Sequence, residues 1–296
     1  MANRRTHELR DILHARIAGR TDHHRLALAV PGGAMRGIVT AGMLLALRDA
    51  GALRVFDSVY GVSSGAINVV RVATGGAWDD LKGYLDFARR PFSTSSLISL
   101  VEGLRFTDES LAVLPYSLNV VVTDVDGILP VWWDTRGRHA TDVRQLLCAS
   151  CWLPILAPHP FEYANKRYAD GALLLTHPAE AAQADGATHV LALLSGAEVP
   201  ARPHVLSFGR RVLARGLDLW APELGSAYLR SRGSFQHNTG TATESGAAPH
   251  IDFLSPTSDG IRVTYWTRDP AALLAGAEAG YSAVTSMLKA RPEGAK

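Results

Sequence analysis

The stretch DSVYGVSSGAINVVRVA, residues 57–73, gives the clearest indication of how this chain folds. Its first part, DSVYGV (57–62), is a short apolar run that predicts a strand. The remainder, SSGAINVVRVA (63–73), is predicted to form a helix, and small residues mark the junction between the two. A strand, a tight turn and a helix in this order form the repeating unit of α/β proteins.

The junction itself, Gly61-Val62-Ser63-Ser64-Gly65, fits the G-x-S-x-G pattern of a nucleophile elbow. A serine exposed at so sharp a turn needs small neighbours, because a Cβ at either glycine would clash. The turn also sets Ser63 at a helix N-terminus, where N–H groups and the helix dipole favour developing negative charge. Since glycine and serine are common residues, the weight of the pattern comes from the strand before it and the helix after it.

A second unit of the same kind precedes this stretch. LALAV (26–30) is a continuous apolar run, which predicts a buried strand, and helical periodicity follows from residue 35 to residue 50. Two successive units predict an α/β fold with a mostly parallel central sheet. Further strands are predicted at 117–125, 128–134, 188–194 and 262–266, and a strand pair at 161–171. Helices are predicted at 5–19, at 141–151, after Pro178, at 204–232 and at 270–289. The polar stretch 236–248 is predicted to be a loop.

No repeat or linker divides the chain sharply, so we expect an N-terminal helical extension (1–24) followed by a single domain (25–296). A net charge of +2, from 30 basic and 28 acidic residues, gives no electrostatic case for nucleic acid. The charged N-terminus does not resemble a secretory signal, and no apolar run approaches a membrane span. With only two cysteines, the sequence predicts a cytoplasmic protein without a disulfide framework.

The loop Gly32-Gly33-Ala34-Met35-Arg36-Gly37 lies between a predicted strand and a predicted helix, so successive N–H groups can converge on an anion. A phosphate loop does not fit, because G-x-G-x-x-G requires glycine at position 34 and the Walker pattern requires Gly-Lys-Ser/Thr. An oxyanion hole fits better: it would hold the charge on a carbonyl oxygen that Ser63 attacks.

A nucleophilic serine also needs a base. Among the eleven histidines, none follows a strand end with an acid before it in the order Ser, Asp, His, and the nearest candidates, His177 and His189, are expected to be loop or surface residues. Asp170, followed by Gly171 and Ala172, is the alternative. An aspartate can take the proton directly where desolvation raises its pKa.

These three elements together resemble the patatin-like phospholipase family. That family carries a G-G-G-x-R/K-G loop, a G-x-S-x-G elbow and a D-G-G/A motif in this order. Here they are GGAMRG (32–37), GVSSG (61–65) and DGA (170–172), and the resemblance extends over roughly residues 25–195. Ala34 stands where the family usually has a third glycine; alanine still supplies an N–H but allows fewer backbone angles.

The resemblance implies a three-layer α/β/α fold related to cytosolic phospholipase A2, no cofactor and no metal. It implies that Ser63 attacks an acyl ester, that Asp170 takes its proton, and that N–H groups of the loop from Gly32 to Arg36 form the oxyanion hole. The Arg36 side chain is expected to fix the loop, while Gly37, Gly61, Gly65 and Gly171 support the motifs. The substrate would be a lipid ester, reached by transient contact with a membrane surface.

Several alternatives stay open. An acyltransferase would use the same acyl-enzyme with an acceptor other than water, and a non-catalytic lipid-binding module would need neither. The apolar residues of 92–118 could line an acyl pocket, cover it, or pack in the core. The sequence does not indicate the lipid head group or the oligomeric state.

Two further motifs have simpler explanations. Asp124-Val125-Asp126-Gly127 is similar to the start of haloacid-dehalogenase-type phosphotransferases, but it follows two complete strand–helix units, so a hairpin turn is favoured. Cys148 and Cys151 have redox spacing, but they lie near a predicted helix C-terminus and cannot form a zinc site unaided. We therefore expect them to be buried thiols.

Overall fold

The structure, a computed structural model, describes residues 2–196, 208–234, 249–256 and 263–290. The strands in these ranges form one eight-stranded sheet in the order β5-β6-β3-β2-β1-β7-β8, with β4 paired to β3. Neighbours among β1, β2, β3, β7 and β8 are parallel, and β4, β5 and β6 are antiparallel. The strands are β1 (Leu26–Val30), β2 (Ser58–Val62), β3 (Ser117–Asp124), β4 (Leu129–Asp134), β5 (Phe161–Tyr163), β6 (Lys166–Asp170), β7 (His189–Leu193) and β8 (His250–Leu254).

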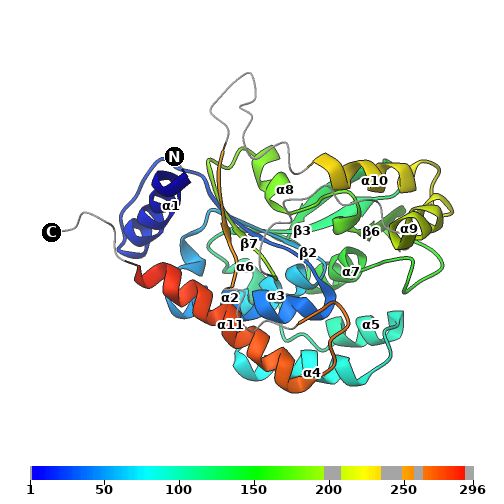
Figure 1. The fold of residues 1–296 in the computed structure, drawn as a ribbon, viewed down its shortest axis with the longest axis horizontal. Coiled ribbons are helices and arrows are strands. Elements are labelled where there is room, and N and C mark those ends of the chain that lie inside the picture. The colour runs from blue at the N-terminus through cyan, green and yellow to red at the C-terminus, as the bar shows by residue number, and fades with distance from the viewer. Residues whose placement is uncertain (1, 197–207, 235–248, 257–262, 291–296) are drawn as a thin grey trace.

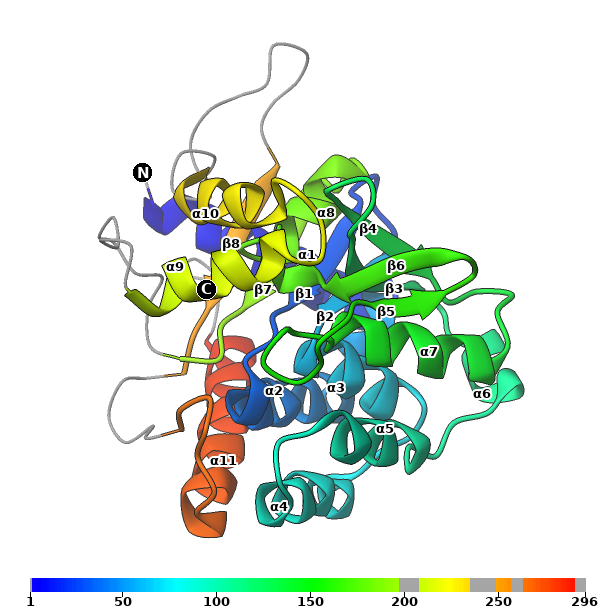
Figure 2. The same cartoon turned by 90° about the vertical axis from the view of Figure 1, so that its right-hand side faces the viewer.

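Helices cover both faces of the sheet. Figure 1 shows α2, α3 and α11 on one face and α8 and α10 on the other, and Figure 2 shows the same layers from the side. This arrangement confirms the predicted three-layer α/β/α fold with a mostly parallel sheet. The α-helices are α1 (Ala2–Ile17), α2 (Gly37–Asp49), α3 (Ser64–Ala73), α4 (Lys82–Arg89), α5 (Thr94–Glu102), α6 (Asp108–Ala112), α7 (Ala140–Ser150), α8 (Ala179–Ala184), α9 (Phe208–Asp218), α10 (Leu224–Ser234) and α11 (Pro270–Lys289).

Strand β1 explains why both layers form. All five of its residues are buried, and its side chains alternate between two separate apolar clusters. Leu26, Leu28 and Val30 belong to the large cluster on the side of α2 and α3, whereas Ala27 and Ala29 pack with the alanines of α8. Small side chains on this second face let the short helix α8 approach the sheet closely.

The end of the chain differs from the sequence prediction in one strand. RVTYW (262–266) was expected to be a strand, but residues 263–266, which the structure describes, are not in one. The Thr264 N–H donates to Thr267 Oγ1 at 2.7 Å, so threonine side chains stabilise a turn instead. The edge strand is β8, whose residues the sequence analysis left without a prediction, while the predicted loop at 236–248 lies outside the described residues.

Helix α1 lies beside the β7–β8 edge of the sheet and also contacts α11 (Figure 1). It is held there by the buried side chains of Leu9, Ile12 and Leu13. Within the described ranges, no helix combines the length and the apolar character that crossing a membrane requires.

Candidate active site

Ser63 lies at the sharp turn between β2 and α3, where its backbone takes φ 54° and ψ −131°. L-residues rarely adopt this region, so the surrounding structure must hold the serine there. Both flanking glycines are required by close packing. A Cβ on Gly61 would lie 2.6 Å from Ala66 Cα, and one on Gly65 would lie 2.5 Å from the Pro31 carbonyl oxygen. The turn therefore has the geometry that the G-x-S-x-G pattern predicts.

The register of the sheet brings Asp170 to the same place. Val62 pairs with Val121 of β3, and Asp170 pairs with the next residue, Val122. Since β4 occupies one edge of β3 from residue 119 to residue 124, β2 and β6 must share the other edge. These two strands run in opposite directions, so their C-terminal ends face each other along this edge of β3. Ser63 follows one end, and Asp170 is the last residue of the other.

Asp170 is 2% exposed and its backbone is held on both sides. Its N–H donates to the Trp152 carbonyl at 2.9 Å, and its carbonyl accepts from Thr123 Oγ1 at 3.0 Å. Its carboxylate Oδ1 accepts the Ala172 N–H at 2.8 Å. The carboxylate is thus fixed in position and removed from bulk water.

Cys151 lies close to both Ser63 and Asp170, which the sequence did not indicate. Burial raises the pKa of the Cys151 thiol well above its usual range, the nearby charge of Asp170 raises it further, and a hydrogen bond with Ser63 acts in the opposite direction. The buried Cys151 thiol therefore contacts Ser63, and the charge of Asp170 affects its pKa. Cys148 is also buried, and both thiols are free, which confirms the expectation for this pair.

Ser150, the last residue of α7, supports the elbow from below. Its Oγ accepts the Ser63 N–H at 2.8 Å and donates to the Val121 carbonyl at 2.6 Å. Ser150 is fully buried. It therefore links the strained serine to the central strand, a contact that depends on tertiary packing and that no local motif signals.

The glycine-rich loop lies directly over Ser63. A Cβ on Gly32 would lie 2.6 Å from Ser63 Cβ, so only glycine lets the loop approach so closely. Gly33 takes φ 154°, and Ala34 takes φ 48°, a conformation in which a third glycine would be unstrained. The Arg36 N–H donates to the Gly33 carbonyl at 2.9 Å, whereas no described residue accepts from the N–H of Gly33 or Ala34.

The Arg36 side chain points away from the serine, toward Tyr265. Its guanidinium carbon lies 4.1 Å from the ring centroid, and Nη2 donates to the tyrosine hydroxyl at 3.0 Å. In addition, the Met35 N–H contacts the Tyr265 carbonyl at 3.4 Å. Tyr265 thus holds the loop from outside, which is possible because residues 264–267 form a turn rather than a strand.

An apolar cavity of about 100 Å³ opens beside Ser63. Phe92, Leu97 and Leu100 line it, while Val101 and Phe106 pack in the core. The segment 92–118 is therefore partly pocket lining and partly core. On the other sides the cavity is lined by Met35, Ile67, Tyr84, Phe87, Leu153, Ile155, Leu156 and Trp266.

His177 and His189, the two histidines nearest to a triad order in the sequence, are both buried. His177 lies in the loop before α8, as expected, whereas His189 lies in β7, so the loop or surface position expected for His189 was wrong. His177 Nε2 donates to the Leu193 carbonyl at 2.9 Å, and Nδ1 accepts the Ala179 N–H at 3.1 Å. Burial lowers the pKa of His177 to about 4. His189 begins β7, at the opposite end of the sheet from Ser63.

The Asp-x-Asp-Gly motif forms the hairpin turn between β3 and β4, as expected. Asp124 Oδ1 accepts the N–H groups of Asp126 and Gly127, and its Oδ2 pairs with Lys166 at 3.1 Å. Asp126 pairs with Arg167. Both carboxylates are therefore neutralised by neighbouring cations of β6.

Comparison with known proteins gives one match by sequence. The model of the patatin-like phospholipase family matches residues 28–116, which include the glycine-rich loop and the elbow and end before Asp170. This confirms the resemblance that the motifs indicate. A comparison with curated proteins finds no match.

Two solved structures are similar to this chain at low sequence identity. VipD from Legionella pneumophila is 14% identical with a TM-score of 0.47, and the match covers 90% of this chain and 67% of VipD. The type III effector protein ExoU is 15% identical with a TM-score of 0.41, and the match covers 90% of this chain and 53% of ExoU. The chain thus spans about half the length of ExoU.

Proposed function

We propose that this chain is a serine acyl hydrolase of the patatin-like type, which cleaves lipid acyl esters with Ser63 as nucleophile and Asp170 as base. The observation that carries the proposal is the shared register on β3. This register brings the C-terminal end of β6, with the buried carboxylate of Asp170, next to the C-terminal end of β2, which the strained Ser63 follows. The family match over residues 28–116 supports the lipid acyl class.

In the proposed reaction, Ser63 Oγ attacks the carbonyl carbon of the ester while Asp170 accepts the hydroxyl proton. Charge then develops on the carbonyl oxygen, and the N–H groups of Gly33 and Ala34 stabilise it. Collapse of the tetrahedral intermediate breaks the bond to the alcohol, which leaves with the proton from Asp170. Water, deprotonated by the same carboxylate, attacks the acyl-enzyme and releases the fatty acid and free Ser63.

Two features of this arrangement favour Asp170 as the base. A carboxylate removed from water is a stronger base than a solvated one, because burial disfavours its charged form. The Ala172 N–H holds one oxygen of this carboxylate in position. Among the described histidines, His177 has both ring nitrogens engaged, and His189 lies at the far end of the sheet.

The apolar cavity supports an acyl chain as the substrate group. At about 100 Å³ it is smaller than typical small-molecule pockets of about 300 Å³ or more, so a long chain must extend beyond it. Ile155 and Trp266 line the cavity and are 64% and 55% exposed. We infer that these side chains form its rim and contact the lipid surface from which the substrate is drawn.

Aromatic side chains at this rim contact one another edge to face. Phe92 makes edge-on contacts with both Phe87 and Trp266, at centroid distances of 5.3 and 5.2 Å. Rotation of Phe92 would break both contacts and enlarge the cavity. In this proposal a lipid surface favours the enlarged state, because the exposed apolar side chains then leave water.

Turnover of a series of p-nitrophenyl esters and of phosphatidylcholine vesicles tests the function. We expect hydrolysis by the wild-type chain, none by Ser63→Ala, and near-normal rates for the control Ser64→Ala, which removes the neighbouring hydroxyl of the same cavity. Added alcohol acceptors distinguish the acyltransferase alternative, because acyl transfer would then exceed release of free acid. A folded wild-type chain that hydrolyses neither substrate, with or without vesicles, would contradict the proposal and favour a binding module.

A further inference from the structure

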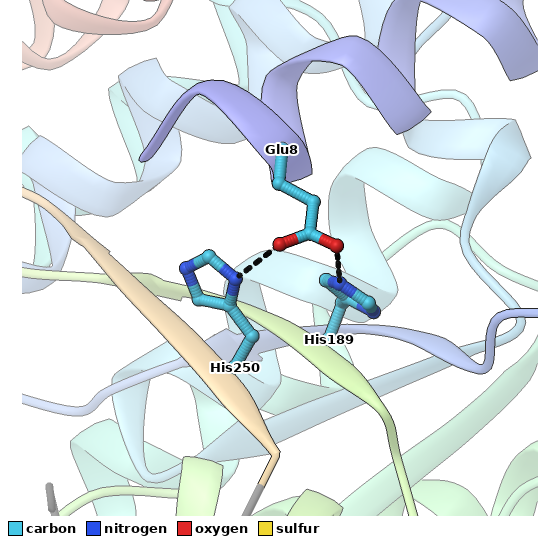
Figure 3. Close-up of side chains that lie close together, drawn as sticks. All are labelled: Glu8, His189 and His250. Carbon is cyan, nitrogen blue, oxygen red and sulfur yellow. Dashed lines mark ion pairs between the residues drawn. The ribbon is translucent and has the colours of Figure 1, made fainter. Parts of the chain in front are cut away.

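Three side chains that are far apart in the sequence converge at the end of the sheet opposite Ser63. Glu8 extends from α1 toward His189, the first residue of β7, and His250, the first residue of β8 (Figure 3). Parallel pairing places the two histidines directly opposite each other, with ring centroids 5.5 Å apart. One potential ligand atom from each of the three residues lies within 4.8 Å of the other two.

The carboxylate faces both rings at a distance that is too long for hydrogen bonds. Glu8 Oε1 lies 3.7 Å from His189 Nε2, and Oε2 lies 3.6 Å from His250 Nδ1. Ligands of a tetrahedral zinc ion with bonds of 2.0–2.1 Å lie about 3.3 Å from one another. The Glu8 to histidine spacings are slightly longer than this, so the three side chains would move inward to bind such an ion.

The outward-facing ring nitrogens each have a second partner. His250 Nε2 contacts Asp252 Oδ1 at 3.0 Å, and His189 Nδ1 contacts Thr188 Oγ1 at 3.0 Å. Metal-binding histidines commonly use their free nitrogen in this way, since the second contact fixes the ring and its tautomer. The other oxygen of Asp252 is buried and has no hydrogen-bond partner among the described residues.

In one tautomer of His250, this arrangement sets two electron-rich groups against each other, and a cation would relieve their repulsion. If the His250 Nε2 proton is donated to Asp252, the Nδ1 lone pair points at the carboxylate of Glu8. A divalent ion between the three ligand atoms relieves the repulsion without protonating either ring.

We propose that Glu8, His189 and His250 bind Zn²⁺ and so fasten α1 to the β7–β8 edge of the sheet. Two imidazoles and one carboxylate suit zinc better than Mg²⁺ or Ca²⁺, which prefer sites made of oxygen ligands. Water supplies the fourth ligand, because Glu8 is 56% exposed and the site is open on that side. The role is structural, since the reacting serine lies at the other end of the parallel strands.

Titration of the metal-stripped full-length chain with ZnCl₂ tests the proposal by calorimetry and by thermal unfolding. We expect one Zn²⁺ per chain and a melting temperature that rises by about 5 °C at saturation, because only the folded state binds the ion tightly. Glu8→Gln and His250→Ala should each weaken binding at least about tenfold. The control His139→Asn removes an exposed histidine that pairs with Asp108, and should change neither measurement.

Glu8→Gln is the deciding variant, because Glu8 lies on the exposed side of α1 and its replacement leaves the buried contacts of the helix intact. Circular dichroism of each variant checks that the fold is retained. Zinc should also slow tryptic cleavage within α1 of the wild-type chain and not of Glu8→Gln. Absence of stoichiometric binding, or binding that Glu8→Gln and His250→Ala leave unchanged, would overturn the proposal.

Discussion

The two ends of the sheet differ in how far water reaches their polar side chains. Where β2 and β6 end, Asp170 is 2% exposed and an apolar cavity lies next to Ser63. Where β7 and β8 begin, the side chain of Glu8 is 56% exposed. A carboxylate without water is suited to accept a proton, whereas an exposed carboxylate that faces two imidazoles is suited to take an ion from solution. Similar residue types thus acquire different chemistry through exposure.

The largest effect is expected from Asp170→Asn, which removes the proposed base and keeps an oxygen that can accept the Ala172 N–H. Ester hydrolysis should fall by about 10⁴-fold, the scale seen when a catalytic carboxylate is neutralised. Steady-state kinetics measure this, with Asp86→Asn on the exposed surface of α4 as the control. Zinc binding at the other end of the sheet should not change. A loss of activity of less than about tenfold would show that Asp170 is not the base.

A smaller effect is expected from lowering the pH, because His177 is buried in its neutral form. The pKa of His177 is lowered by burial to about 4, below the value in the unfolded chain. The unfolded state therefore binds the proton more readily, and the stabilisation is complete above about pH 6.5 and is lost as the pH falls toward 4. The shift corresponds to about 3 kcal/mol at most.

Denaturant unfolding of wild type and His177→Gln between pH 4 and pH 7 measures this contribution. The wild type should lose more stability on acidification than the variant does. The rate at which the folded chain hydrolyses esters should be the same in wild type and in His177→Gln. Equal acid sensitivity of the two chains would show that His177 is not held neutral in the folded state.

Ser150→Ala tests how firmly the elbow is held. The change leaves the Ser63 N–H and the Val121 carbonyl without their buried partner, which should cost about 1–3 kcal/mol of folding free energy. Hydrolysis should slow as well, since the serine loses a contact that fixes its backbone. Chemical denaturation and kinetics follow both effects, with Ser99→Ala as a control because its hydroxyl accepts a hydrogen bond from the exposed Arg90. An unchanged unfolding midpoint would mean that the elbow is held by other contacts.

Ala34→Gly should have the smallest effect on folding stability, and it should raise the stability rather than lower it. Ala34 takes φ 48°, so glycine relieves backbone strain but also gives the unfolded chain more freedom. The net gain in stability should be below about 1 kcal/mol. The control Ala77→Gly, at an exposed residue with φ −116°, should destabilise slightly. If both variants lower the melting temperature equally, the loop is not strained at residue 34.

The sequence predicted those parts of the candidate site that local geometry determines. Gly61 and Gly65 indicate the elbow, because neither position has room for a Cβ. Gly32 indicates the loop that packs on Ser63. The strands around the site were predicted because a sheet covered on both faces requires continuous apolar runs. These features depend on neighbouring residues in the chain, and a single sequence is enough to recognise them.

Contacts between distant segments could not be predicted in this way. Ser150 and Cys151 reach Ser63 only because the end of α7 packs beneath the elbow. Glu8 meets two histidines only because α1 lies along the last strands. No spacing motif joins such residues.

The strand predicted at 262–266 was wrong for a local reason. Its β-branched and aromatic residues are typical of strands, but side-chain hydrogen bonds of Thr264 and Thr267 favour a turn. The turn places Tyr265 against Arg36 and so supports the glycine-rich loop.

Covalent labelling of the folded chain with a fluorophosphonate, followed by peptide mapping with mass spectrometry, identifies the nucleophile directly. We expect a single adduct on Ser63. It should be absent from Ser63→Ala, form much more slowly in Asp170→Asn, and be unaffected by removal of zinc. Labelling of another serine, or equal labelling of Asp170→Asn and wild type, would contradict the proposed roles of Ser63 and Asp170.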